Sequence, residues 1–136
     1  MRQRVLFICT HNSARSQMAE GLLKAFYGDR YEAYSAGTQP SGVNPNAVRV
    51  MNEIGIDISA HRSKSVDEFR ESKFDYVITV CDQARETCPF FPGGRTYLHQ
   101  GFEDPSEFKG TPEETVAVFR RVRDEIRAWI METFGE

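Results

Sequence analysis

A cysteine and an arginine stand at the two ends of one short loop between a predicted strand and a predicted helix. Cys9 ends the apolar run that starts at Val5, and Arg15 follows six residues later, directly before Ser16. Backbone N–H groups in such a loop, together with the start of the helix, can surround one tetrahedral oxyanion. The planar guanidinium of arginine can bind two anion oxygens at once, which lysine cannot do. The expected oxyanion-binding residues are Thr10, His11, Asn12, Ser13, Ala14 and Arg15.

Cys9 is the expected nucleophile of this loop. The positive field of the loop favours the thiolate, which is the reactive form of cysteine, and Ser16 can donate a hydrogen bond to it. A thiolate inside an anion-binding loop predicts attack on the central atom of the anion. A lone cysteine after an apolar run is also commonly just a small buried side chain. The position of the loop between a strand and a helix favours the catalytic interpretation.

The elements that must position this loop alternate along the chain. Strand-like runs occupy residues 4–9, 31–37, 76–80 and 95–99. Helical spacing predicts helices from Ser16 to a stop at Gly28, from Pro45 to Gly55, after Ser65, and from Pro112 to Phe134. This alternation predicts an α/β fold, a single three-layer domain over residues 1–136 with a four-stranded parallel sheet and helices on both faces.

The predicted sheet also indicates where a ligand would bind. In open parallel sheets the ligand crevice lies at the carboxyl ends of the strands. Cys9, Cys81 and the residues after His99 all follow predicted strands. We therefore expect these positions to converge.

Composition and charge exclude several classes of function. The chain has 136 residues and a formal net charge of −3, which argues against a general nucleic-acid binder. No apolar run approaches the roughly 18 residues of a membrane span, and the run after Arg4 is too short for a signal peptide. We expect a cytoplasmic monomer without nucleic-acid or membrane partners. Its three cysteines are then expected to be reduced at rest.

Asp104 is the candidate acid, in a loop after the last predicted strand. Pro105 restricts the residue before it to extended conformations, so Asp104 is held in a defined direction. A carboxyl group held in this way can give or take a proton during a reaction. An Asp-Pro pair is also common in turns, and the residues alone favour that simpler interpretation.

Cys81 and Cys88 form a second group of thiols, at and beyond the end of the strand predicted at 76–80. They can be packed side chains, metal ligands or a redox pair. His11, His61 and His99 make no recognised zinc spacing with them, so we expect no metal site.

Several segments together resemble the low-molecular-weight tyrosine phosphatase superfamily, and more closely the arsenate reductases that share its phosphotyrosine phosphatase I-like fold. The resemblance runs over nearly the whole chain. The segments are "CTHNSARSQMAEG" from Cys9, "SAGT" at 35–38, "NPNAV" at 44–48, "GIDISAHRS" at 55–63, "VITVCD" at 77–82 and "GFEDP" at 101–105.

The resemblance implies a role for each candidate residue. It gives the general-acid role to Asp104, with the neighbouring Glu103 as the alternative. The spacing of Cys81 and Cys88 is similar to that of thioredoxin-coupled arsenate reductases, which act in arsenic resistance. Cys9 would capture arsenate, Cys81 would attack Cys9 as arsenite leaves, and Cys88 would then form a redox-active disulfide with Cys81. Thioredoxin would reduce that disulfide, and no bound cofactor is expected.

The residues after Asp-Pro separate this prediction from its main alternative. The phosphatases of the superfamily typically carry tyrosines there, whereas this chain has Ser106, Glu107 and Phe108. The alternative is a low-molecular-weight protein tyrosine phosphatase that hydrolyses phosphotyrosine through a Cys9 phosphoenzyme. Weak phosphatase activity is expected in either case. A third hypothesis is an anion- or redox-sensing module without turnover.

Asn12, Glu20 and Ser35 match polar positions that support the loop in related reductases, some of which bind potassium. Those members have an acidic residue where this chain has Lys64. We expect the lysine ammonium to replace the cation, and therefore no potassium dependence. Glu20 can alternatively be a solvated helix charge. His11 stands where many relatives have glycine, and we assign no role to His61, Arg62 or His99.

Overall fold

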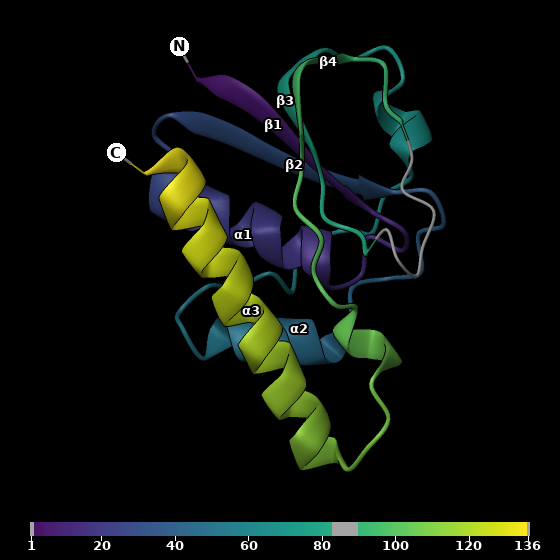
Figure 1. Ribbon diagram of the computed structural model, residues 1–136, viewed down its shortest axis with the longest axis vertical. Coiled ribbons are helices and arrows are strands. Elements are labelled where there is room, and N and C mark those ends of the chain that lie inside the picture. The colour runs from purple at the N-terminus through teal and green to yellow at the C-terminus, as the bar shows by residue number, and fades with distance from the viewer. Residues whose placement is uncertain (1, 83–89, 136) are drawn as a thin grey trace.

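The structure is a computed structural model that describes residues 2–82 and 90–135 (Figure 1). Four strands and three α-helices alternate along the chain, with two short 3-10 helices between them. The strands are β1 Gln3–Cys9, β2 Tyr31–Gly37, β3 Phe74–Thr79 and β4 Gly94–His99. The α-helices are α1 Arg15–Tyr27, α2 Pro45–Asn52 and α3 Pro112–Phe134, and the 3-10 helices are η1 Val66–Phe69 and η2 Pro105–Glu107.

The strands form one parallel sheet in the order β2-β1-β3-β4. In the central strand β1, the side chains of Val5, Leu6, Phe7 and Ile8 are fully buried. A strand covered on both faces requires such a continuous apolar run, because neither face meets water. The predicted α/β fold with a four-stranded parallel sheet is confirmed.

The two faces of the sheet carry different layers. All three α-helices pack on one face, where Phe7 of β1 joins a core that includes Met18 of α1 and Phe119 of α3 (Figure 1). The opposite face buries Leu6 and Phe74 against Phe91, with partly buried side chains from η1. Helices therefore cover both faces, as predicted, but the second layer in the described part of the chain is a single 3-10 turn and loops.

The helix starts follow the capping residues expected from the sequence. Asn44 caps α2 by accepting a hydrogen bond from the backbone N–H of Asn46 at 2.8 Å, and Ser65 caps η1 in the same way. The strand predicted at 76–80 instead spans Phe74–Thr79. The polar Asp75 interrupts the apolar run near the start of this strand, so the run alone does not show that the strand begins at Phe74. The Asp75 carboxylate accepts the backbone N–H of Arg4.

The carboxyl ends of the three neighbouring strands meet at one edge of the sheet. The N–H of Val80 donates to the carbonyl of Ile8 at 2.9 Å, and the N–H of Phe102 donates to the carbonyl of Val80 at 3.3 Å. The residues that follow, Cys9, Cys81 and the 101–108 segment, therefore start from adjacent positions, as predicted. Within residues 2–82 and 90–135, no helix has both the length and the apolar content needed to cross a membrane.

Candidate active site

The backbone carbonyl groups of the loop after β1 accept hydrogen bonds from the residues that surround the loop. The carbonyl of Thr10 accepts the N–H of Gln39 at 2.8 Å, and that of His11 accepts the N–H of Ser41 at 3.2 Å. The carbonyl of Asn12 accepts Nε2 of Gln17 at 3.2 Å. The carbonyl of Ser13 completes the series by accepting the N–H of Asn44 at 2.9 Å.

This pattern determines where the amide N–H groups of the loop point. In a trans peptide the carbonyl and the following N–H point in opposite directions, and the described residues contain no cis peptide. Four consecutive carbonyls that face outward therefore turn the next four N–H groups toward the centre of the loop. Those groups belong to His11, Asn12, Ser13 and Ala14. The start of α1 lies beside them, and no side chain caps it.

Asn12 allows the loop to close by taking a left-handed conformation. It has φ = 47°, the only positive φ among the described non-glycine residues, and it is completely buried. Asparagine tolerates this region better than most residues. Its side chain is fixed because Oδ1 accepts the N–H of Lys64 at 2.8 Å and Nε2 of Gln17 at 2.9 Å.

The thiol of Cys9 faces the hydroxyl of Ser16. Sγ and Oγ are 2.9 Å apart, and both residues are buried. Nδ2 of Asn12 donates to the same Ser16 oxygen at 2.7 Å. The Ser16 hydroxyl therefore lies within hydrogen-bond distance of the Cys9 sulfur, and it can donate to that sulfur when Cys9 is a thiolate.

Arg15 links the loop to the candidate acid. Its guanidinium is almost completely buried; Nη1 donates to the carbonyl of Phe102 at 3.2 Å, and Nη2 lies 3.5 Å from Oδ2 of Asp104. Glu103 extends in another direction and pairs with Arg121 of α3 at 2.5 Å. The geometry therefore favours Asp104 over Glu103 as the carboxylate of the site.

Gln17 and His61 form a buried support that the sequence analysis did not identify. Besides Asn12, Nε2 of Gln17 donates to the carbonyl of Arg62 at 3.0 Å. These acceptors orient the amide so that Oε1 faces Nδ1 of His61 at 3.0 Å, and the His61 N–H must donate to it. Burial lowers the pKa of His61, which favours its neutral form. The support thus connects the 61–64 segment to Asn12.

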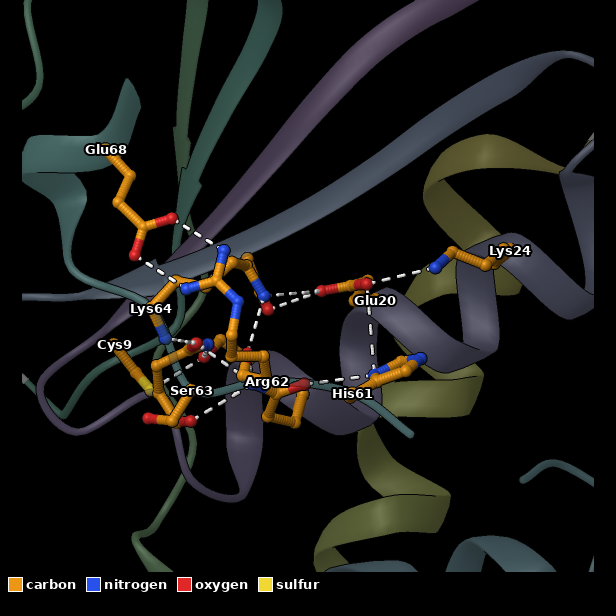
Figure 2. A network of polar contacts seen from close by, with 12 residues as sticks. Cys9, Glu20, Lys24, His61, Arg62, Ser63, Lys64 and Glu68 are labelled. Atoms are coloured by element: carbon orange, nitrogen blue, oxygen red, sulfur yellow. Dashed lines mark hydrogen bonds and ion pairs between the residues drawn. The ribbon is translucent and has the colours of Figure 1, made fainter. Parts of the chain in front are cut away.

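Glu20 is a buried carboxylate and not a solvated helix charge. Ser35 donates to its Oε1 at 2.5 Å, and Lys24 pairs with its Oε2 at 3.1 Å (Figure 2). The ammonium of Lys64 lies 3.8 Å from Oε1 and also donates to the carbonyl of Arg62 at 2.7 Å. Burial lowers the pKa of Lys64, and the charge of Glu20 opposes that shift. The positive groups around Glu20 are thus supplied by side chains.

Cys81 lies just beyond β3, at the same sheet edge as Cys9. Its side chain is completely buried, and it is disulfide-bonded, whereas Cys9 is a free thiol. Cys88 falls outside the described residues. His11, Arg62 and His99 lie near the surface. His11 contacts the carbonyl of Gln39, Arg62 pairs with Glu68, and His99 contacts Thr79. Within residues 2–82 and 90–135, no three metal-ligating side chains gather at one place.

Comparisons with known proteins match this geometry to one family. Residues 4–134 match the family model described as low molecular weight phosphotyrosine protein phosphatase. An arsenate reductase of Halalkalibacterium halodurans is 52% identical over 132 residues, which cover 97% of this chain and 94% of the relative. A solved arsenate reductase in the phosphate binding state has 32% identity and a TM-score of 0.80, with 97% of this chain and 95% of that chain covered.

A further solved relative is a thioredoxin-dependent arsenate reductase of Corynebacterium glutamicum, with 30% identity and a TM-score of 0.62. The match covers 97% of this chain and 64% of that chain. The chain belongs to the low molecular weight phosphotyrosine protein phosphatase family, and within it to the arsenate reductases. The family resemblance drawn from the sequence is confirmed.

Proposed function

We propose that this arsenate reductase works through a three-cysteine relay in the cytoplasm and is regenerated by thioredoxin. The observation that carries the proposal is the series of outward-facing carbonyls from Thr10 to Ser13, which turns four N–H groups toward the loop centre. A tetrahedral oxyanion bound there meets the Arg15 guanidinium and the Cys9 sulfur. The site captures its anion without a resident metal.

The first chemical step forms a bond between Cys9 and arsenic. The thiolate, which accepts the Ser16 hydroxyl hydrogen, attacks the arsenic atom, and one arsenic–oxygen bond breaks. The departing group is a hydroxyl of arsenate, and Asp104 gives its proton to that oxygen, which leaves as water. Arg15 and the loop amides stabilise the charge on the remaining oxygens. Arsenic is still As(V) in this adduct.

The electrons move in the next two steps. Cys81 attacks the Cys9 sulfur, a disulfide forms, and the pair of electrons of the sulfur–arsenic bond stays with arsenic, which leaves as arsenite. Cys88 then attacks Cys81, so that Cys9 is released as a thiolate and a Cys81–Cys88 disulfide remains. The dithiol of thioredoxin reduces this disulfide by exchange and becomes oxidised itself.

Two observations support the relay. Cys81 follows the strand that pairs with β1, so its chain position adjoins that of Cys9 at the sheet edge. It is also disulfide-bonded while Cys9 is free, which is consistent with a part for Cys81 in disulfide exchange. The thioredoxin-dependent relative from Corynebacterium glutamicum is consistent with this choice of reductant.

The same loop chemistry also predicts a slow phosphatase activity. Phosphate esters offer the loop the same tetrahedral oxygens, and Asp104 would protonate the leaving ester oxygen as its bond to phosphorus breaks, so that an alcohol departs instead of water. The full alternative, a tyrosine phosphatase, lacks the tyrosines after Pro105 that would bind an aromatic substrate. We therefore treat hydrolysis as a side reaction.

The test is NADPH consumption by this protein with thioredoxin and thioredoxin reductase, with and without arsenate. We expect arsenate-dependent consumption that is lost in Cys81→Ser and in Cys88→Ser. Hydrolysis of para-nitrophenyl phosphate serves as the matched control, because it needs Cys9 but neither of the other thiols. Both variants should retain this hydrolysis.

Two results would contradict the proposal. If arsenate does not increase NADPH consumption with thioredoxin, and glutaredoxin also fails as a second electron donor, the result would favour the phosphatase. Equal loss of reduction and hydrolysis in Cys88→Ser would indicate a structural role for that residue.

A further inference from the structure

The two carboxylate oxygens of Asp104 have different surroundings. Oδ1 accepts two hydrogen bonds from Ser106, one from its backbone N–H at 3.0 Å and one from its hydroxyl at 2.7 Å. Oδ2 faces the anion loop and lies 3.5 Å from Nη2 of Arg15. The Asp104 side chain is only 13% exposed, whereas Ser106 is at the surface.

The backbone fixes this arrangement. Asp104 is the N-cap residue of η2, with φ = −80° and ψ = 106°, and Pro105 follows at the first helical position. The proline ring keeps Asp104 extended, so its side chain folds back over the next residues. The backbone N–H at position 106 would hold Oδ1 with any residue other than proline there. The hydroxyl is a contribution of this particular residue.

The hydrogen bonds decide which oxygen can carry a proton. A carboxyl oxygen has two lone pairs, and both of those on Oδ1 are used by the two donors of Ser106. When Asp104 is protonated, its proton must therefore reside on Oδ2. That oxygen is the one next to Arg15 and the anion loop.

We propose that Ser106 is a positioning residue that confines the acidic proton of Asp104 to Oδ2, the oxygen that faces the bound oxyanion. The inference rests on the proposed role of Asp104 as proton donor to the departing oxygen. Without the hydroxyl, Oδ1 regains a free lone pair, and part of the protonated population carries its proton on the wrong side. Ser106 touches neither substrate nor sulfur and acts only through Asp104.

The experiment measures one turnover of the prereduced enzyme without thioredoxin. Loss of free thiols after mixing with saturating arsenate reports the formation of the adduct and the disulfide. The variants are Ser106→Ala, Ser106→Thr, Asp104→Asn and the double variant with Ser106→Ala and Asp104→Asn. Thermal unfolding of each variant controls for folding, and the exposed position of Ser106 favours intact folding.

We expect Asp104→Asn to slow the turnover by about 100-fold or more, as for loss of a general acid. Ser106→Ala should slow it about five- to tenfold, in line with one lost hydrogen bond, at an unchanged arsenate concentration for half-saturation. Ser106→Thr keeps the hydroxyl and should restore the rate to within about twofold of wild type, because it keeps that hydrogen bond. In the Asp104→Asn background, Ser106→Ala should have no further effect.

The outcomes separate the two levels of the proposal. A fast Asp104→Asn variant would overturn the role of Asp104 and the inference together. A slow Asp104→Asn variant with a wild-type Ser106→Ala rate would overturn only the role of Ser106. An equal slowing by Ser106→Ala in both backgrounds would also overturn it, because the effect would then not pass through Asp104.

Discussion

The two loops that meet at the site are held in different ways. The loop from Cys9 to Arg15 buries Cys9, Asn12 and Arg15, and its carbonyls and the Asn12 side chain are bonded to segments 39–44 and 61–64. The segment around Asp104 is held by its own neighbours and by the exposed Glu103–Arg121 pair. The anion loop is thus held by buried long-range hydrogen bonds, whereas the acid is placed by contacts with Ser106, by Arg15 and by an exposed ion pair. Removal of a side chain that supports the first loop should therefore lower stability more than removal of one that supports the segment around Asp104.

Cys9→Ser should give the largest effect, a complete loss of both arsenate reduction and phosphate ester hydrolysis. The serine hydroxyl will not ionise in this site, so no nucleophile remains. The loop amides and Arg15 are unchanged, and the variant should still be stabilised by inorganic phosphate in a thermal shift measurement. Phosphate stabilisation with no turnover would show that anion binding is separate from the chemical step. Arsenate-dependent turnover in this variant would contradict it.

Gln17→Ala tests whether the loop from Cys9 to Arg15, the capture loop, depends on contacts with distant parts of the chain. Gln17 is completely buried and bonds to Asn12, His61 and the carbonyl of Arg62. Its loss leaves buried polar groups without partners, so the free energy of unfolding should fall by about 2 kcal/mol. We expect anion affinity to fall as well, as measured by urea unfolding with and without phosphate. Gln39→Ala is the control, because only the backbone of this exposed residue supports the loop. Equal effects of the two variants would show that the buried Gln17 side chain does not support the loop.

Arg121→Ala tests the segment around Asp104 and should lower stability much less than Gln17→Ala. Arg121 and Glu103 are about half exposed, with relative side-chain exposures of 48% and 50%. Exposed ion pairs contribute about 0–1 kcal/mol, so we expect a small fall in unfolding temperature and a turnover rate within about twofold of wild type. The difference from wild type should shrink further at high salt. A loss as large as that of Gln17→Ala would mean that α3, rather than local contacts, positions the acid.

Potassium should have no effect. The ammonium of Lys64 and the side chain of Lys24 already neutralise Glu20, at 3.8 Å and 3.1 Å from its carboxylate oxygens. Reduction rates measured in potassium and in sodium salts of equal ionic strength should therefore agree. A higher rate in potassium would show that Lys64 and Lys24 do not replace a bound cation beside Glu20.

The sequence was sufficient to predict the sheet and where most of its helices start. Asn44 and Ser65 act as caps at the expected positions, and the apolar run of β1 occupies the centre of the sheet. These features depend on local propensity and apolar spacing, which a sequence displays directly. The family resemblance added the interpretation of Asp104.

Gln17 and His61 were missed for a physical reason. An amphipathic helix is expected to expose its polar residues, so a glutamine in its first turn is predicted to be a solvated side chain. In α1, however, every residue from Arg15 to Leu23 is buried, because the 61–64 segment covers the side that would face water. The partners of Gln17 lie 44 and 45 residues away in the chain. Long-range polar pairing of this kind leaves no periodic signal in a single sequence.

The outward-facing carbonyls of the capture loop have a consequence for competition in the cell. A ring of N–H groups recognises the shape and charge of a tetrahedral anion and makes no distinction between phosphorus and arsenic. Inorganic phosphate should therefore compete with arsenate for the same place, and the apparent arsenate affinity should fall in proportion to the phosphate that is present. Selectivity arises only after binding, because a thiol can draw arsenic, but not phosphorus, into a two-electron reduction. Phosphate occupies the site and leaves it unchanged, while arsenate is consumed there.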